Sequence, residues 1–151
     1  MGLYQLIYQS VSLVPFEPAQ LTAMLSWSRA FNSERRVSGL LLHTVDGRFL
    51  QVLEGDREDV RHLYFDRIRP DPRHHQCRVF SEGPCPHRAF PRWQMGFRMA
   101  QAQDLRLLLS SVPSDIPGLL VPRPHTRTEI MALLMEFLKR GEVDAAQEHP
   151  W

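Results

Sequence analysis

Residues 38–55 read SGLLLHTVDGRFLQVLEG, two apolar runs joined by the pair Asp46-Gly47. An Asp-Gly pair in this position is a strong signal for a tight β-hairpin, because glycine readily adopts the positive backbone angle that the turn requires. The pattern predicts one strand over residues 37–43 and its returning partner over residues 48–53. Both runs are apolar on each face, so we expect them to lie in a sheet that is covered on both sides.

The segment before the hairpin predicts a strand and a helix. Residues 3–9 alternate two sets of side chains with the period of a strand. The stretch VSLVPFEP carries two prolines and indicates a connection. Pro18 suits the first turn of a helix. The residues that then recur at helical spacing are Leu21, Met24, Leu25, Ser28 and Asn32.

The segment after the hairpin predicts a second helix and two more strands. Asp56 is placed to cap the helix, and the prolines at 70 and 72 end it. Strands are expected over residues 76–81 and 93–99, separated by a loop that contains prolines. The inward positions of the helix would be Val60, Leu63, Tyr64, Arg67 and Ile68.

The elements follow in the order strand, helix, strand, strand, helix, strand, strand. This order matches an α+β, ferredoxin-like β-α-β-β-α-β-β plan, in which a mixed sheet carries two helices on one face. Towards its end the chain predicts a short helix over residues 104–110 and a longer one over residues 126–140. We expect these C-terminal helices to cover the other face of the sheet.

The composition excludes several classes of protein. A chain of 151 residues has the length of one domain, with 43% apolar and 23% charged residues. Its 18 basic and 17 acidic side chains argue against a binder of nucleic acid or of a membrane surface. It contains neither a run long enough to span a membrane nor a signal peptide, so we expect a cytoplasmic protein. Cys77 and Cys85 are too few for a disulfide framework.

Polar side chains interrupt the predicted apolar faces. Gln51 lies among large apolar neighbours on its strand, and Tyr8 ends the apolar face of the first strand. Ser28 and Asn32 continue the stripe of the first helix, and Arg67 lies on the inward side of the second. Singly, each has a simpler explanation, such as a cross-strand aromatic, a helix C-cap or a paired arginine. If both helices pack on one face, the groups converge in a groove of the kind that holds a cofactor.

Five blocks of the sequence resemble those of the BLUF family, the blue-light sensors that use FAD. The blocks are collinear over about residues 3–97, and FLQVLEG and DPRHH joined to an upstream SR-x-x-N are specific signals. The five blocks are LIYQS, SWSRAFN, SGLLLHTVDGRFLQVLEG, DRIRPDPRHH and FPRWQMGF.

The resemblance implies that FAD binds between the two helices and that Tyr8 and Gln51 form the photoactive pair. It also implies that Trp93 and Met95 relay the signal to the sheet. Phe31 departs from the family pattern, which often has a polar side chain there, so one contact to the flavin ring is expected to be lost or replaced by packing. The cofactor-binding residues that the resemblance implies are Tyr8, Ser28, Asn32, Gln51, Arg67, Asp71, Arg73 and His74.

The resemblance also indicates how the signal leaves the protein. Residues 1–99 would form the flavin-binding sensor, and residues 100–151 a helical extension that packs on the sheet in place of a separate effector domain. Short BLUF proteins act through partner proteins and usually self-associate. We therefore expect no enzymatic activity, a homo-oligomer and a downstream signalling protein.

Three other functions remain open on the residues alone. A metal- or anion-binding regulatory module without photochemistry is one, because five possible metal ligands lie close in sequence, although their spacing is not that of a zinc knuckle. An acyl-phosphate hydrolase of ferredoxin-like fold is another, although VSLVPFEP lacks the glycines of an anion loop. A structural interaction module is the third. The possible ligands are His74, His75, Cys77, Cys85 and His87.

Overall fold

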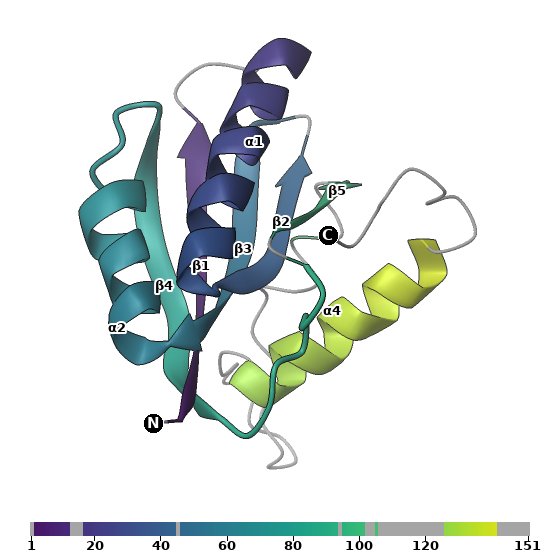
Figure 1. Cartoon of the computed structure of the whole chain (residues 1–151). Coiled ribbons are helices and arrows are strands. Elements are labelled where there is room, and N and C mark those ends of the chain that lie inside the picture. Colours follow the sequence, from purple (N-terminus) through teal and green to yellow (C-terminus); the bar gives the residue numbers. More distant parts are fainter. Residues whose placement is uncertain are drawn as a thin grey trace.

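The elements of the computed structural model follow the predicted order (Figure 1). The structure describes residues 2–12, 17–44, 46–93, 95–101, 105 and 126–141. The elements are β1 (Leu3–Ser12), α1 (Pro18–Arg35), β2 (Ser38–Thr44), β3 (Arg48–Asp56), α2 (Arg57–His62), η1 (Leu63–Ile68), β4 (His74–Cys85), β5 (Gly96–Ala100) and α4 (Arg127–Gly141).

The strands form one mixed sheet in the order β4-β1-β3-β2-β5. β1 is antiparallel to both of its neighbours, β2 and β3 form the predicted hairpin, and β5 runs parallel to β2. The α1 connection places β2 parallel to β1 with β3 between them, which is the split βαβ arrangement. The predicted ferredoxin-like fold is therefore confirmed.

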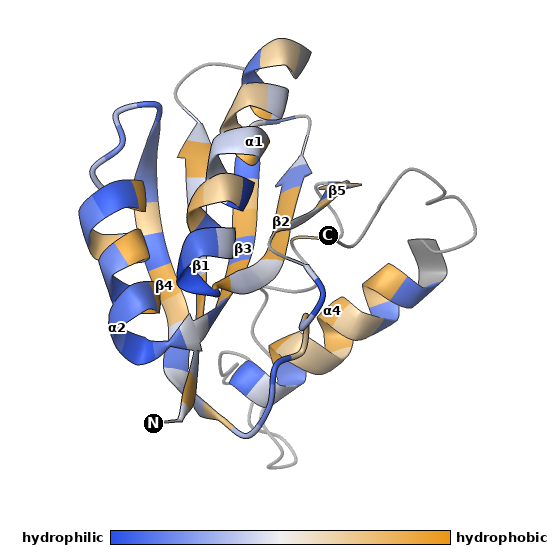
Figure 2. Ribbon diagram, in the orientation of Figure 1, coloured by the Kyte–Doolittle hydropathy of each residue, from blue (hydrophilic) through white to orange (hydrophobic). Residues whose placement is uncertain are grey.

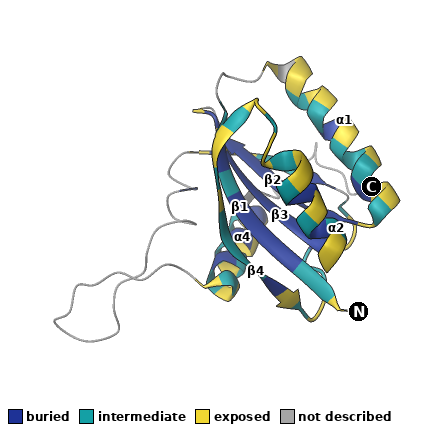
Figure 3. Cartoon of the chain, turned by 90° about the vertical axis from the view of Figure 1, so that its left-hand side faces the viewer, coloured by how far each residue is buried: buried dark blue, intermediate teal, exposed yellow. Residues whose placement is uncertain are grey.

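Helices cover the sheet on both sides (Figure 3). α1 and α2 pack on one face, which we call the near face, and α4 packs on the opposite, far face. The prediction that a C-terminal helix covers the far face holds for residues 126–140. The predicted helix over residues 104–110 lies outside the described residues except for Leu105, which is buried in the far-face core.

Strand register divides the apolar side chains between the two faces. Tyr8 pairs with Gln51, and Gln51 pairs with Leu41, so these three side chains share the near face. Ile7 and Val52 form the neighbouring pair and point to the far face, because side chains alternate along a strand. Figure 2 shows the resulting hydrophobic colouring of the central strands.

α4 is held to the far face by an apolar stripe and by one arginine. Ile130, Leu134 and Leu138 recur at helical spacing and are buried against the sheet. At the first turn, Arg127 donates hydrogen bonds to the carbonyl oxygens of Gln5 (3.4 Å) and Pro84 (2.7 Å). The first turn of α4 is therefore fixed to β1 and β4.

The second helix differs from its prediction. It begins after Asp56 as expected, but the Asp56 side chain makes no capping hydrogen bond. From Leu63 the helix widens into the π-helix η1, closed by a hydrogen bond of 2.8 Å from the Arg69 amide to the Tyr64 carbonyl. Leu63 and Tyr64 are buried as predicted, whereas Arg67 is exposed. A π-helical turn contains one residue more than an α-helical turn. Neither the composition nor the spacing of apolar residues in the sequence indicates this extra residue.

The last strand begins later than predicted. The chain turns at residues 90–93, where the Trp93 amide donates to the Phe90 carbonyl (3.3 Å), and β5 starts only at Gly96. Pro91 favours the turn, because its fixed backbone angle suits the second position. Trp93 therefore precedes the strand that it was predicted to begin.

No helix within the described ranges is both long and apolar enough to cross a membrane.

Gly39 allows β2 to pack closely against β3. A Cβ atom at this position would lie 1.8 Å from the Val52 carbonyl oxygen, and the Gly39 amide donates to the Trp93 carbonyl (2.9 Å). The absence of a side chain therefore permits both the β2–β3 contact and the approach of the segment that precedes β5.

We expect Gly39→Ala to lower the free energy of unfolding by about 1–3 kcal/mol, the usual cost of forcing a methyl group into a packed site. Urea denaturation measures the change. Gly2→Ala is the control, since a Cβ atom there meets nothing within 4 Å. Equal unfolding midpoints for the two variants would contradict the close contact at Gly39.

Candidate functional site

A cavity of about 450 Å³ lies between α1 and the helix formed by α2 and η1, on the near face of the sheet. Ligand sites for small molecules commonly have volumes of about 300–1,000 Å³. Leu41 and Phe49 contribute from the hairpin strands, Met24 and Trp27 from α1, and Leu63 from η1. The walls are thus mainly apolar.

The polar side chains singled out from the sequence line this one cavity. They come from β1, α1, β3, η1, the turn after η1 and the first residue of β4. The eight are Tyr8, Ser28, Asn32, Gln51, Arg67, Asp71, Arg73 and His74. The structure therefore brings together every residue that was predicted to contact the cofactor.

A chain of hydrogen bonds crosses the near face from Tyr8 to Met95. The Tyr8 hydroxyl donates to Gln51 Oε1, and Gln51 Nε2 donates to Met95 Sδ at 3.1 Å. All three side chains are buried, with 3%, 6% and 0% of their surface exposed. The Gln51 amide thus uses its acceptor towards Tyr8 and its donor towards Met95.

Burial keeps the Tyr8 phenol protonated. Loss of solvent raises its pKa well above the ordinary value of 10.0, and the nearby Cys77 thiol and Tyr64 phenol raise it further. The Tyr64 ring lies 4.8 Å from the Tyr8 ring, and burial raises the pKa of Tyr64 to about 12. Tyr8 therefore remains a hydrogen-bond donor at neutral pH.

Asn32 and Ser28 lie one turn apart on the cavity side of α1. Asn32 is 1% exposed, so its amide is buried at the cavity wall. The simpler explanation of Asn32 as a helix C-cap is wrong, because Arg36 takes that position with a backbone φ of 56°. Phe31 does not line the cavity but packs between the Trp27 ring (5.2 Å) and the Arg35 guanidinium (4.1 Å).

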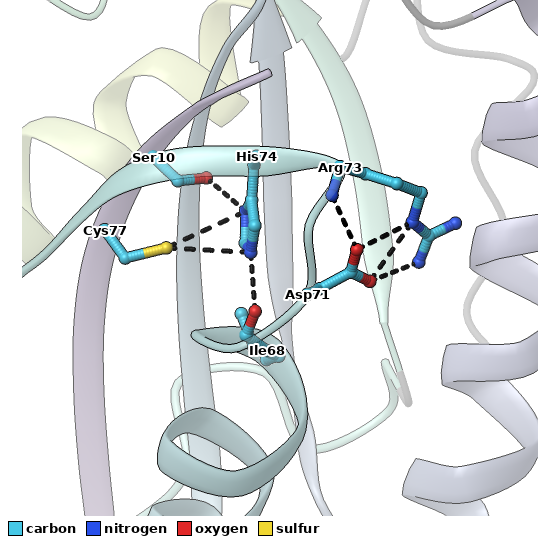
Figure 4. Close-up of polar contacts among 6 residues, drawn as sticks. All are labelled: Ser10, Ile68, Asp71, Arg73, His74 and Cys77. Atoms are coloured by element: carbon cyan, nitrogen blue, oxygen red, sulfur yellow. Dashed lines mark hydrogen bonds and ion pairs between the residues drawn. The ribbon is translucent and has the colours of Figure 1, made fainter. Parts of the chain in front are cut away.

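Two sets of polar contacts, around Asp71 and around His74, lie beside the cavity (Figure 4). We call this side, where Arg67 and Arg73 are exposed, the mouth of the cavity. Arg73 Nη2 lies 2.6 Å from Asp71 Oδ2, and this hydrogen-bonded guanidinium lowers the pKa of the Asp71 carboxyl group. His74 sits between the Ser10 hydroxyl (2.9 Å) and the Ile68 carbonyl (2.5 Å). Arg67 is exposed and forms no ion pair with a carboxylate of the described ranges.

Trp93 and Met95 lie on opposite faces of the sheet. Met95 is buried in the near-face core beside Gln51. Trp93 packs against the far-face core, stacked on Phe90 with ring centroids 5.8 Å apart. A Cβ atom at Gly96 would lie 2.1 Å from the Trp93 ring, so the indole rests directly on that glycine.

The possible metal ligands do not assemble into a site. Cys77 Sγ lies 3.6 Å from His74 Nε2, but this histidine also contacts Ser10 and Ile68. Within the part of the chain that the structure describes, no three His, Cys, Asp or Glu side chains are arranged to hold a metal ion. Burial raises the pKa of both Cys77 and Cys85.

Trp27 and Arg29 were missed at the sequence level. Trp27 lines the cavity although 51% of its surface is exposed, and its outward position gave no sign of a binding role. Arg29 donates from α1 to the Met95 carbonyl at 3.3 Å and so connects the helix to the segment before β5. In the sequence, the position of Arg29 within the SR-x-x-N block was the feature that could have indicated its role.

The chain matches known light sensors. The family described as "BLUF: Sensors of blue-light using FAD" covers residues 3–96. The photoactivated adenylate cyclase subunit beta of Euglena gracilis is 40% identical over 96 residues, which are 62% of this chain and 11% of that protein. The chain thus spans only a small part of the length of this curated relative.

Solved structures agree in fold. The dark-state structure of BlrB, a BLUF protein, has a TM-score of 0.66 and 26% identity, covering 93% of this chain and 97% of BlrB. The photo-activated state of BlsA has a TM-score of 0.62 and 26% identity, covering 70% of this chain and 75% of BlsA. Because the family match extends over residues 3–96, the chain belongs to the BLUF family, the sensors of blue light that use FAD.

Proposed function

We propose that this protein senses blue light with FAD bound in the near-face cavity, that Tyr8 and Gln51 are the light-responsive pair, and that the signal passes to a partner protein. The observation that carries the proposal is the buried hydrogen-bond chain from Tyr8 through Gln51 to Met95. It lies where the cavity meets the sheet, so a ligand there can act on it directly.

The cavity suits a flavin. Its apolar walls favour a flat ring system, and the amides of Asn32 and Gln51 offer donors and acceptors to the polar edge of such a ring. Ser28 lies beside them on α1. At the mouth, Arg67 and Arg73 suit phosphate oxygens. The phosphate-bearing tail would therefore leave the cavity between η1 and β4, past Asp71 and His74.

The chemistry of the pair follows from its hydrogen bonds. When bound, the flavin absorbs blue light and becomes a strong oxidant. With the flavin as acceptor, Tyr8 would give up an electron, and its O–H proton would move to Gln51 Oε1, to which it is already hydrogen-bonded. The electron and one proton would return to Tyr8 on recombination: the proton leaves Oε1 if the amide has rotated, and leaves Nε2 if Oε1 keeps its new proton. Gln51 would then be left rotated or in its imidic tautomer. Either change reverses which of its two polar atoms donates and which accepts.

A changed Gln51 amide alters both of its neighbours. A half-turn of the amide would exchange its two polar atoms, so Nε2 would leave Met95 Sδ for the cavity side, where Oε1 now accepts from Tyr8, and could donate to a bound flavin. Such an added hydrogen bond would shift the flavin absorption slightly to the red. The same rotation would remove the hydrogen bond that Met95 Sδ accepts. One event would therefore change both the absorption of the flavin and the packing of the segment before β5.

We expect Tyr8→Phe and Gln51→Ala to abolish the light-induced red shift while flavin stays bound, because each removes one end of the hydrogen bond. Absorption spectra before and after blue light measure the shift. Tyr4→Phe is the matched control, since Tyr4 lies on the same face of β1 but donates to Glu82 at 2.5 Å. A full shift in Tyr8→Phe would exclude Tyr8 as the donor.

The raised pKa of Tyr8 predicts that the response does not weaken at moderately alkaline pH. A phenol with the ordinary value of 10.0 would be partly ionised at about pH 9.5 and could not donate its proton. Tyr8 keeps its proton there, so the amplitude of the red shift at about pH 9.5 should equal that at pH 7. An amplitude that falls with an apparent pKa near 9 would contradict the burial argument.

The signal can leave through the far face. A second cavity of about 440 Å³ lies between the turn at residues 90–93 and α4, lined by Trp93, Met135 and Leu138. This space allows the turn to move when Met95 repacks. We propose that residues 1–99 act as the sensor and that the extension over residues 100–151 presents the changed surface to a signalling protein or to a second copy of the chain.

Met95→Ala should keep flavin bound but uncouple the light signal from the far face, because the amide then loses its contact to the segment before β5. The readout is the light-dependent change in oligomeric state or in partner capture, compared with the spectral shift. Met99→Ala, a change at an exposed position of β5 that lines neither cavity, is the control for lost methionine volume. The relay would be excluded if Met95→Ala retained both the shift and the light-dependent association.

A further inference from the structure

Glu54 is a carboxylate buried in the far-face side of the sheet, and no surface of it is exposed. It lies three residues after Gln51 on β3, so the two side chains point to opposite faces. Burying a carboxylate is costly unless hydrogen bonds replace the lost water. The contacts that Glu54 makes therefore indicate what this buried group is for.

Three N–H groups donate to the Glu54 carboxylate. The amide of Ala89 donates to Oε2 at 2.8 Å and the amide of Phe90 to Oε1 at 2.9 Å. Gln5, on the neighbouring strand β1, donates its side-chain amide to Oε2 at 2.8 Å. Two of the three donors are thus backbone groups of the loop that leads to Trp93.

Arg88 adds a second attachment at the same place. Its guanidinium donates to the Glu54 carbonyl (3.1 Å), to the Ser38 hydroxyl (2.7 Å) and to the Arg36 carbonyl (2.6 Å). The arginine thus binds backbone and hydroxyl oxygens around Glu54, whereas the carboxylate itself receives neutral donors.

The segment from Arg88 to Met95, which we call the relay segment, is held at both ends. Glu54 and Arg88 fix its beginning, the Gly39 amide binds the Trp93 carbonyl, and Arg29 binds the Met95 carbonyl. Between these points the chain passes from the far face, where Trp93 packs, to the near face, where Met95 meets Gln51. The position of its beginning therefore constrains where both side chains can lie.

We propose that Glu54 is a positioning residue for the light response: by binding the amides of Ala89 and Phe90 it sets the position of Trp93 and Met95 relative to Gln51, and so the rate at which the light-induced arrangement returns to the dark one. This inference rests on the proposed function of the Tyr8–Gln51 pair. Glu54 itself acts only through the relay segment and has no contact with the cavity.

A carboxylate suits this role better than an amide. Its two oxygens accept all three bonds, and neither carries a hydrogen that would oppose an N–H donor. In Glu54→Gln, one of the two atoms becomes an NH₂ group that faces the amide of Ala89 or Phe90, so at least one bond is lost. The substitution removes the attachment without opening a cavity.

The test compares Glu54→Gln with Glu82→Gln in the flavin-bound protein. Glu82 is the matched control, because this carboxylate accepts bonds from Tyr4 and Arg61 at the β4 edge and does not touch the relay segment. Hydrogen exchange of the Ala89 and Phe90 amides in the dark measures whether they remain bonded to residue 54. The half-life of the red-shifted state measures the functional effect.

We expect the amides of Ala89 and Phe90 to exchange at least tenfold faster in Glu54→Gln and the half-life to change at least threefold, with neither effect in Glu82→Gln. Faster exchange with an unchanged half-life would reduce Glu54 to a structural role and overturn the proposal, as would unchanged exchange. If Glu54→Gln does not fold, Glu54→Asp decides by the same two readouts, because it moves the carboxylate away from the Ala89 and Phe90 amides by one methylene. Absence of any light-induced shift in the unsubstituted protein would instead refute the proposed function, while the exchange experiment would still test the attachment.

Discussion

The pairing of β1 with β3 in a single register is the constraint on which the site depends. It sets Tyr8 directly opposite Gln51 on the near face. A slip by one residue would turn one of the two side chains to the far face, among the apolar residues that contact α4. Apolar residues on both faces oppose such a slip, since Leu6 and Leu53 fill the near-face core while Ile7 and Val52 fill the far-face core. The same packing that stabilises the sheet thus holds the donor and acceptor together.

The two faces of the sheet differ in what they contact, and the relay segment runs from one face to the other. The near face holds the cavity and the hydrogen bonds of Gln51, while the far face is closed by α4. Only a few bonds define the path between them, from Glu54 at one end to Arg29 at the other. Because packed cores resist gradual deformation, the proposed change at Gln51 would favour a switch between two arrangements of this segment over a small shift spread through the domain.

Local patterns were sufficient to predict most of the fold. The Asp46-Gly47 turn predicted the hairpin, and alternation in residues 3–9 predicted the first strand, because both signals reside in neighbouring residues. The π-helical turn at Leu63 and the late start of β5 at Gly96 were not predicted, because the spacing of apolar residues marks neither the widened helical turn nor the turn at residues 90–93.

The residues of the site could be predicted from the sequence, but their arrangement in space could be predicted only in part. Gln51 and Asn32 were recognisable because a polar residue in an apolar stripe needs a partner. Glu54 was not, because a glutamate near the end of a strand normally faces water, and only the structure shows the loop amides that cover it. Likewise the sequence placed Trp93 and Met95 two residues apart but could not show that they pack on opposite faces of the sheet.

The attachment of α4 at Arg127 gives the covering helix a fixed end. The Arg127 guanidinium lies against Gly83, where a Cβ atom would be only 2.8 Å from Nη1, so no larger residue fits at that position without displacing it. In the other half of the helix, Leu138 and Lys139 line the cavity that lies between α4 and the turn at residues 90–93. Under the proposed function, a displacement of the turn at residues 90–93 would therefore act on α4 near the end opposite its attachment to β1 and β4.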